Sequence, residues 1–301
     1  LSTVPVIEGY ETAPSWNYYQ NLNQSGAIYI ATTDNVAELT FGNADFENKT
    51  DDDMDAANAY TPVDKIAVVT APGITLFGAR DHLTGGSGLY KVIQTKESKF
   101  HWIEAIVDGT MDGDGIYLES VQFSVIRNTT IKQASGGTVS ALWLLRSHNN
   151  SISGLTIEDA ASRGIALTGS TYNIFESCSV NSSGNSIFIY KAIVDTIDYF
   201  SSHNEFKDLT IDGGTDVILT DTNYNSFTNM TNAVDLYLKH SKNNTFRNLN
   251  NKGSIFIGFT YKNSDLNKFY NTKVIGQIKI DGSHRNLFYN THISNAGEGI
   301  N

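Results

Sequence analysis

The feature that most constrains this chain is a short phrase, Asn-x-Phe, which recurs through its second half. The steps between successive asparagines are 31, 21, 19, 23 and 19 residues. Such a nearly constant step indicates one structural unit stacked repeatedly on itself. Asn150-Ser151-Ile152 resembles an earlier copy, with Ile in place of Phe. The six copies are Asn173-Ile174-Phe175, Asn204-Glu205-Phe206, Asn225-Ser226-Phe227, Asn244-Thr245-Phe246, Asn267-Lys268-Phe269 and Asn286-Leu287-Phe288.

A second phrase, apolar-x-apolar-x, keeps step with the first. Alternation with a period of two is typical of a half-buried β-strand. Each unit therefore holds one strand at Asn-x-Phe and another at the alternating phrase, with turns rich in Asn, Gly, Ser and Asp between them. The eight copies are residues 116–119, 142–145, 165–168, 187–190, 217–220, 236–239, 255–258 and 278–281.

Units of this length with almost no helical signal predict an all-β parallel solenoid, in which each strand pairs with its equivalent one coil away. The recurring asparagines are expected to stack at one bend, with their amides hydrogen-bonded up and down the column. Over residues 65–301 the pattern resembles the right-handed parallel β-helix of the pectate-lyase-like superfamily. That superfamily includes polysaccharide lyases, glycoside hydrolases, epimerases and phage tailspike depolymerases. The resemblance implies the fold and a polysaccharide ligand, and it leaves the reaction open.

Residues 1–64 do not follow the repeat, and we interpret them as an irregular N-terminal cap. Because the chain begins at Leu1 rather than at methionine, we expect a processed or excised piece of a longer protein. Two acidic clusters give a weak Ca²⁺ signal, but a helix start and turn chemistry explain them more simply, so no cofactor is predicted. The clusters are Asp51, Asp52, Asp53 and Asp55, and Asp108, Asp112 and Asp114.

The formal net charge of −11 argues against nucleic acid or an anionic membrane surface as a partner. No apolar run approaches the roughly 20 residues that span a bilayer, so no membrane partner is predicted. The single cysteine, Cys178, follows Phe175 at the spacing where other units carry Leu or Met. We therefore interpret it as a small buried apolar residue rather than a reactive thiol.

Aligning the alternating strands predicts which side chains point outward. If the flanking Ile and Leu residues point inward, the residue between them faces outward in every coil. Five of the eight outward residues are aromatic, which predicts either a platform for a long glycan, a contact between chains in a trimer, or packing under a loop. We name Tyr117, Trp143, Phe188, Tyr237 and Phe256 as substrate-binding candidates. The outward column is Tyr117, Trp143, Ala166, Phe188, Ile218, Tyr237, Phe256 and Lys279.

Polar residues concentrate at the ends of the same strands. A β-eliminating lyase needs cations to neutralise a uronate and a Lys, Tyr or His to take its C5 proton. Tyr190 with Lys191 is the predicted reacting pair, and Arg146 and Lys239 are predicted to hold a carboxylate or sulfate, with His240 beside them. We call these strand ends the polar ribbon: Glu119, Arg146, Tyr190, Lys191, Asp221, Lys239 and His240.

A glycoside hydrolase would instead need two carboxylates about 5 to 9.5 Å apart. Glu119 and Asp221 are four coils apart, about 19 Å at the usual strand spacing, so they do not make that pair. Aspartates in the turns remain as alternative partners, namely Asp159, Asp195, Asp198 and Asp212.

The widest step contains an insertion after Lys191, residues 192–200. Binding residues gather in loops on rigid scaffolds, so this insertion is predicted to form a wall beside Phe188 and Tyr190. The alternative is a strand extension that packs against a neighbouring subunit.

Together these patterns predict an extracellular or virion-associated enzyme that degrades a long, acidic polysaccharide, either a lyase or a glycoside hydrolase. A homotrimer with parallel axes is expected from the tailspike resemblance. The alternative is a non-catalytic glycan-binding adhesin or a structural trimeric spike.

Overall fold

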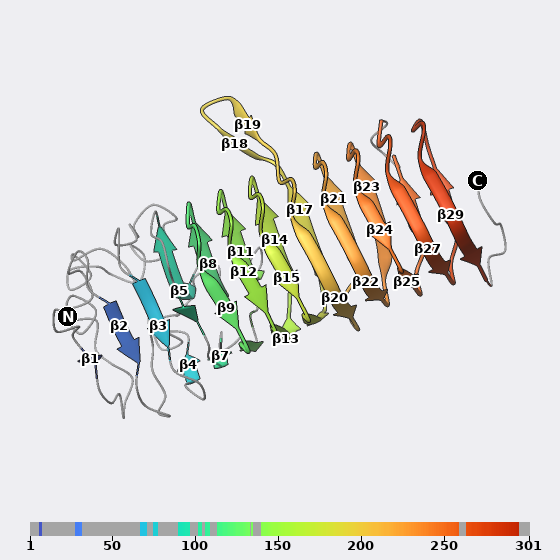
Figure 1. Ribbon diagram of the computed structural model, residues 1–301. Helices are drawn as coiled ribbons and strands as arrows, with labels where there is room; N and C mark the ends of the chain where they lie inside the picture. The colour runs from blue at the N-terminus through green and yellow to red at the C-terminus, as the bar shows by residue number, and fades with distance from the viewer. Residues whose placement is uncertain are drawn as a thin grey trace.

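The chain winds into a long parallel β-helix whose axis runs along the length of the molecule (Figure 1). The computed structural model describes residues 6–7, 28–31, 67–70, 75–77, 90–96, 102–103, 106–108, 113–132, 134, 140–258 and 263–294, with side chains from residue 115 onward. All the regular elements in these ranges are β-strands. The predicted all-β parallel solenoid is confirmed.

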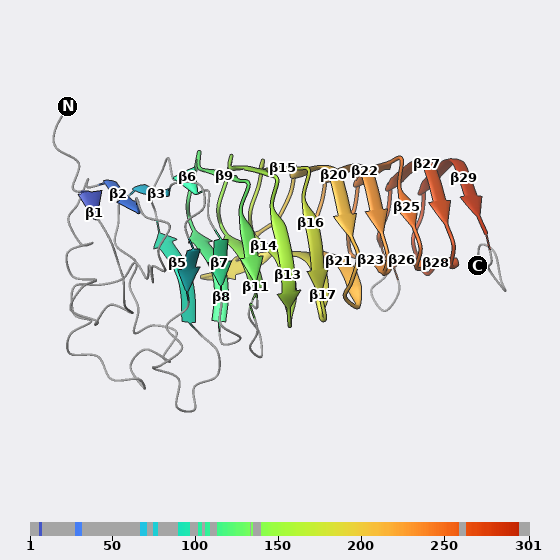
Figure 2. The ribbon, with the colours of Figure 1, turned by 90° about the horizontal axis from the view of Figure 1, so that it is seen from below.

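Each coil contributes strands to three faces. Face 1 carries the Asn-x-Phe strands, face 2 follows it after a bend, and face 3 carries the alternating strands. In Figure 2 the equivalent strands of successive coils lie side by side along the axis. Face 1 consists of β1 (Val6–Ile7), β2 (Ile28–Ala31), β3 (Ala67–Thr70), β6 (Trp102–Ile103), β9 (Val125–Arg127), β12 (Ser151–Ser153), β15 (Ile174–Glu176), β24 (Thr245–Arg247) and the first halves of β20 (Glu205–Ile211), β22 (Ser226–Asn232), β27 (Lys268–Val274) and β29 (Leu287–Ile293).

Face 2 takes the second halves of those four long strands, together with β4 (Thr75–Phe77), β7 (Ile106–Asp108), β10 (Thr130–Lys132), β13 (Thr156–Ala160), β16 (Ser179–Ser182) and β25 (Asn250–Asn251). Face 3 consists of β5 (Tyr90–Lys96), β8 (Gly113–Glu119), β11 (Ser140–Leu145), β14 (Arg163–Thr168), β17 (Asn185–Tyr190), β21 (Asp216–Thr220), β23 (Asp235–Lys239), β26 (Ile255–Ile257) and β28 (Ile278–Ile280). An antiparallel hairpin, β18 (Ala192–Val194) and β19 (Ile197–Tyr199), projects from the edge after β17 (Figure 1).

The predicted phenylalanine stack forms the centre of the core. Successive rings lie 4.6 to 4.9 Å apart with interplanar angles of 1° to 10°. All but the last are nearly inaccessible to solvent. Because each ring fills the same place in its coil, the period of the sequence sets the period of the core. The stacked rings are Phe175, Phe206, Phe227, Phe246, Phe269 and Phe288.

The asparagines stack as predicted, at the bend that leads from face 3 to face 1. The Oδ1 atom of Asn225 accepts bonds from the backbone and side-chain nitrogens of Asn204, both at 3.0 Å. Its own amide donates to the Ser201 carbonyl oxygen (3.1 Å) and to Oδ1 of Asn244 (3.2 Å). Asn150 joins the same ladder through Asn173. Each buried turn therefore has its polar backbone satisfied by the next coil.

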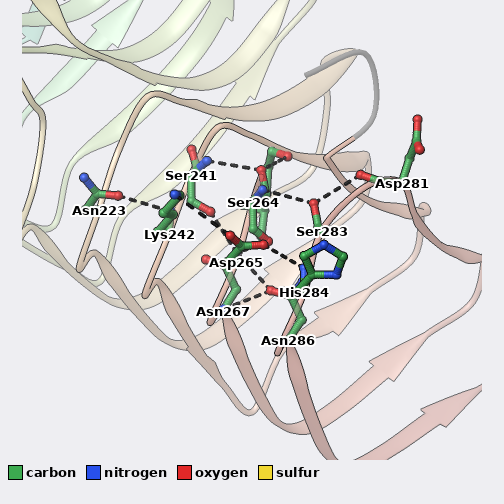
Figure 3. Close-up of polar contacts among 11 residues, drawn as sticks. Asn223, Ser241, Lys242, Ser264, Asp265, Asn267, Asp281, Ser283, His284 and Asn286 are labelled. Atoms are coloured by element: carbon green, nitrogen blue, oxygen red, sulfur yellow. Dashed lines mark hydrogen bonds and ion pairs between the residues drawn. The ribbon is translucent and has the colours of Figure 1, made fainter. Parts of the chain in front are cut away.

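A second polar ladder lies three residues before the asparagines and was not foreseen from the sequence. A backbone N–H donates to the hydroxyl one coil on, as from Ser241 to Ser264 (3.1 Å) and from Ser264 to Ser283 (3.0 Å). Figure 3 shows these hydroxyls beside Asn267 and Asn286. The full column is Ser147, Ser170, Ser201, Thr222, Ser241, Ser264 and Ser283.

The coil turns use left-handed backbone at fixed positions. One such position follows the face 3 strands and another immediately precedes the asparagine ladder. A third lies between face 1 and face 2, and its residues are Asn128, Gly154, Ser177, Asp208, Asn229, Asn248, Asn271 and Asn290. Asn and Gly adopt this conformation most readily, which explains why most of these residues are Asn or Gly. Strand β2, from the segment predicted as a cap, pairs in parallel with β1 on one side and with β3 on the other. The boundary at residues 64 and 65 remains a prediction.

Candidate polysaccharide site on face 3

The predicted outward column is in register along face 3. Tyr117 pairs with Trp143, Phe188 with Ile218, and Tyr237 with Phe256 across successive strands. Ala166 and Lys279 occupy the expected places in the column. The sequence alignment of these strands is therefore correct.

The column is less open to water than the alternation predicts. Tyr117 and Ile218 are each 8% exposed, and Ala166 is fully buried between its larger neighbours. The other aromatic members of the column, Trp143 and the rings that follow it, are half-buried. An alanine between two large rings is covered by them, so outward direction and exposure differ here.

The rings of the column pack against one another. Tyr117 and Trp143 meet edge to face at 5.1 Å, and the Trp143 indole N–H donates to Thr168 (2.9 Å). Tyr237 and Phe256 stack at 4.6 Å with an interplanar angle of 11°. One face of each stacked ring is thus covered by the other ring. A glycan lying along the column would meet ring edges as well as ring faces.

Arg163, at the start of β14, was missed by the sequence analysis. Its guanidinium lies 4.7 Å from the ring centre of Phe188 and 5.9 Å from that of Tyr190. This cation–π contact places a permanent positive charge beside the column. Arg163 lies two residues before Ile165, the first residue of the aligned alternating phrase, so the alignment did not reach it.

The first part of the polar ribbon is an ion pair between neighbouring coils. Arg146 Nη2 lies 2.5 Å from Glu119 Oε1, and the Tyr117 hydroxyl donates to the other oxygen of the same carboxylate at 3.2 Å. Arg146 is two strands of face 3 away from Tyr190. It is four strands away from His240, about 19 Å at the usual strand spacing, so Arg146 lies at the far end of the predicted catalytic set.

The second part of the ribbon begins with Lys191. Its ammonium lies 2.9 Å from Asp198 on the hairpin. The hydrogen bond to Asp198, followed by the charges of Asp221 and Asp198, raises the pKa of Lys191 above its usual value. A lysine with a raised pKa keeps its proton at neutral pH, so Lys191 suits a cationic role and not that of a base.

On the next two coils Asp221 and His240 form a pair. Nδ1 of His240 lies 3.4 Å from Asp221 Oδ1, and the histidine side chain is 46% exposed. A carboxylate facing Nδ1 favours the tautomer with the proton on that atom and the lone pair on Nε2. Lys239, the preceding residue, places its ammonium 5.1 Å from the Tyr237 ring centre. Tyr190 and Lys239 belong to one column, separated by Thr220.

The structure thus places five polar residues at the ends of three consecutive strands, β17, β21 and β23, or directly after them, beside the aromatic column. We call them the central cluster. It contains two lysines for charge neutralisation, a tyrosine and a histidine able to transfer protons, and the carboxylate that orients the histidine. The members are Tyr190, Lys191, Asp221, Lys239 and His240.

A carboxylate pair at the other end of two of these strands was also missed. Asp216 and Asp235 are register partners on adjacent coils, about 5 Å apart at the usual strand spacing. Partial burial, followed by the charge of Asp235, raises the pKa of Asp216 above its ordinary value. Burial and the same two carboxylates raise the pKa of Tyr237. Asp235 also accepts the backbone N–H of Ser254 at 2.6 Å.

The predicted insertion is the β18–β19 hairpin. Its two-residue turn, Asp195 and Thr196, has both residues in left-handed backbone, as a type I′ turn requires. A β-carbon at Gly169 would come within 2.9 Å of Ala192 and 3.0 Å of Tyr199, so the hairpin base packs closely on the preceding coil. Ile193 and Ile197 near its tip are 64% and 56% exposed.

Among the residues whose side chains are described, no group of three His, Cys, Asp or Glu residues is placed to hold a metal ion. The cluster from Asp51 to Asp55 lies outside the described residues, as does Asp112. Burial raises the pKa of the Cys178 thiol to about 11, which confirms its interpretation as a buried apolar residue.

Comparison with known proteins identifies the handedness of the fold. Residues 82–220 match the family described as "Right handed beta helix region". With the parallel ladders of all three faces, this makes the protein a right-handed parallel β-helix. No curated protein matches the sequence. Within the described part of the chain, no helix has the length and apolar character needed to cross a membrane.

Solved structures share this architecture at low sequence identity. An alginate lyase from Paenibacillus sp. str. FPU-7 is 16% identical, with a TM-score of 0.50, over 81% of this chain and 95% of that one. The A-module of the mannuronan C-5 epimerase AlgE4 from Azotobacter vinelandii is 8% identical, with a TM-score of 0.55, over 95% and 92% of the two chains. The corresponding module of AlgE6 has a TM-score of 0.56 at 8% identity, over 95% and 89%. These similarities establish the fold.

Proposed function

We propose that this protein is a polysaccharide lyase that cleaves an acidic polysaccharide at the central cluster on face 3. The observation that carries the proposal is the juxtaposition of Tyr190, His240 and two lysines on three consecutive strands beside the aromatic column. Similarity to an alginate lyase and to mannuronan epimerases supports a uronate polymer as the substrate class.

Lys191 and Lys239 neutralise the uronate carboxylate. Abstraction of a proton next to a carboxylate builds negative charge on that group, and a positioned cation lowers the cost of this charge. The raised pKa of Lys191 keeps it charged while it is held by Asp198. This role differs from the predicted one, in which Lys191 formed the reacting pair with Tyr190.

His240 and Tyr190 carry out the proton transfers. Nε2 of His240 takes the C5 proton, while the electron pair of the C5–H bond forms the C4–C5 double bond. The bond between C4 and the glycosidic oxygen breaks, and the departing oxygen receives the Tyr190 phenol proton. Asp221 keeps the histidine ring oriented.

The remaining predicted residues bind the chain away from the reacting sugar. The column from Trp143 to Phe256 runs parallel to the axis, so a long chain lying on it crosses the central cluster. Arg146 is engaged with Glu119 two strands away from Tyr190, and we assign it to a neighbouring sugar carboxylate.

Hydrolysis is the second candidate, favoured by the carboxylate pair alone. Asp216, with its raised pKa, has the property of a general acid, and its register partner Asp235 is one strand spacing away, about 5 Å, which is close to the spacing of a retaining pair. The backbone bond that Asp235 accepts from Ser254 favours a structural role for this aspartate. We therefore place elimination first.

The proposed substrate also bears on assembly and location. We propose an extracellular or virion-associated protein, because long acidic polysaccharides occur on cell surfaces. We propose that it assembles as a homotrimer through surfaces other than the aromatic column, which the glycan occupies. Sedimentation should give three times the monomer mass. A stable monomer at micromolar concentration would refute the proposed trimer and would not affect the proposed binding of the glycan to the aromatic column.

The test is a panel of alginate, polygalacturonate, hyaluronate and chondroitin sulfate, followed by ultraviolet absorbance and by reducing-end release. Elimination creates an unsaturated end that absorbs, so both signals should rise together with at least one polymer. Reducing ends without absorbance would mean hydrolysis and would shift the site to Asp216 and Asp235. Binding without either signal would support the alternative of a non-catalytic adhesin. Epimerisation would change the sugar composition of the polymer without releasing reducing or unsaturated ends.

A further inference from the structure

A second row of aromatic side chains lies outside face 3, at the turn that leads to face 1. The rings of Tyr172 and His203 stack at 4.9 Å with an interplanar angle of 17°, and those of His203 and Tyr224 at 5.1 Å with 16°. Tyr172 and Tyr224 are 55% and 54% exposed. We call these three residues the turn stack.

Folding does not explain the turn stack. Its members have φ angles of 57° to 58°, in the left-handed region that a bulky side chain adopts at a cost. The same position in other coils is occupied by Asn149 and Asn243, at φ 57° and 56°, and by Phe123, Leu266 and Arg285, at φ 56°, 60° and 57°. Asparagine adopts this backbone more readily than a bulky residue does, so the exposed rings of three consecutive coils carry a backbone cost that burial does not offset.

The turn stack lies beside the central cluster. Tyr172 follows β14 by four residues and Tyr224 follows β21 by the same number, so the stack spans the coils that begin at these strands. Asp221 of the central cluster is three residues from Tyr224. A chain leaving face 3 over this edge therefore meets the stack within one turn.

The surroundings favour a glycan over a second protein chain. The column before the stack is polar, with Thr171, Ser202 and Asn223 paired across coils. Standard protein interfaces bury about 800 Å² on each partner around an apolar centre, which a row one residue wide with polar flanks does not supply. Aromatic rings with hydroxyl and imidazole groups at their edges offer both apolar contact and hydrogen bonds to a sugar.

We propose that the turn stack is a secondary binding site for the same acidic polysaccharide, which holds the chain outside the central cluster. The inference rests on the proposed substrate class but not on cleavage. It predicts that the stack contributes to the binding of long chains and leaves the turnover of oligosaccharides that occupy only face 3 unchanged.

The decisive variant is the double substitution Tyr172→Asn with Tyr224→Asn, because neighbouring coils already carry Asn at this position. Affinity electrophoresis in gels containing alginate, polygalacturonate or hyaluronate measures binding. The double variant should bind about tenfold more weakly, a change of about 1.4 kcal/mol, with an unchanged or higher melting temperature. Tyr289→Asn, at a 64% exposed site on face 1, is the matched control and should bind like the native protein.

Four results would overturn the inference: equal binding by the double variant, a lower melting temperature, lost self-association with binding intact, or no binding of any of these polymers by the native protein. The first three leave the proposed lyase activity untouched, and the release of unsaturated ends tests that activity separately. Weakened binding without any cleavage would support the turn stack and refute the lyase.

Discussion

Replacing Asn225 by alanine tests whether the buried asparagine ladder holds the coils together. The side chain is 1% exposed and makes four hydrogen bonds, two accepted from Asn204 and two donated to Ser201 and Asn244. Asn225→Ala leaves the Asn204 backbone N–H without its partner. The Asn204 side-chain amide, the Ser201 carbonyl oxygen and the Asn244 Oδ1 atom each lose one hydrogen bond. A buried unsatisfied group costs about 1 to 3 kcal/mol, so we expect a total loss of about 3 to 5 kcal/mol.

Urea unfolding followed by circular dichroism measures this loss, with an unchanged slope showing that the variant still unfolds as one unit. Asn290→Gly is the control. It removes the exposed bond to Asn271 at 2.9 Å in a position with φ 51°, which glycine adopts readily, so its effect should stay within about 0.5 kcal/mol. A loss below about 1 kcal/mol for Asn225→Ala would refute the reasoning.

The substitution Asn225→Asp adds a pH signature to the same test. The new carboxylate would face the Ser201 carbonyl and the Asn244 Oδ1 atom in a buried place, so its folded-state pKa should rise above the unfolded value of about 3.9. The folded state then binds more protons than the unfolded state between these two values. The destabilisation should be full at neutral pH and shrink as the pH falls toward about 4. A loss independent of pH would contradict the assigned contacts.

Four further predictions test other parts of the structure. Phe227→Ala should cost about 3 to 5 kcal/mol in urea unfolding because it removes a ring stacked on both sides, and a loss under about 1 kcal/mol would contradict the core. Gly169→Ala adds a β-carbon at φ +59° against the hairpin base, so limited proteolysis should cut the hairpin faster than in the native protein. Asp216→Asn should raise the melting temperature at pH 7 and leave it unchanged near pH 3. The raised pKa of Asp216 means that its ionised form destabilises the folded state, and this form is absent at pH 3, where the carboxyl group is protonated in both states. Cys178 should react with iodoacetamide only in denaturant, because its thiol is buried with a pKa of about 11.

The sequence predicted the core because the core repeats. Each Phe of Asn-x-Phe fills the same place in its coil, and each Asn bonds to the next, so spacing alone identified both columns. The hydroxyl ladder has the same period, as Ser241 and Ser264 show. It escaped notice because serine is also frequent in ordinary turns, and only the bonds between coils distinguish the two uses.

The candidate site was predicted as a surface and not as a set of contacts. Strand alignment located the outward column correctly, but burial depends on neighbours across coils, as Ala166 shows by being fully covered. The role of Lys191 could not be anticipated, because its partner Asp198 reaches it only through the hairpin fold. Asp216 and Asp235 were missed because the alignment began at the first inward residue of each strand and left out the position before it.

The most direct test of the proposed function is the rate at which unsaturated ends form, compared between the native protein and His240→Gln on the polymer that the native protein cleaves. Loss of a positioned general base lowers rates by about 10² to 10⁴-fold. We predict a loss in this range with binding unchanged. The control His292→Gln changes an exposed residue on face 2 and should keep the native rate. Equal rates for native protein and His240→Gln would contradict the assignment of the central cluster as the reacting site.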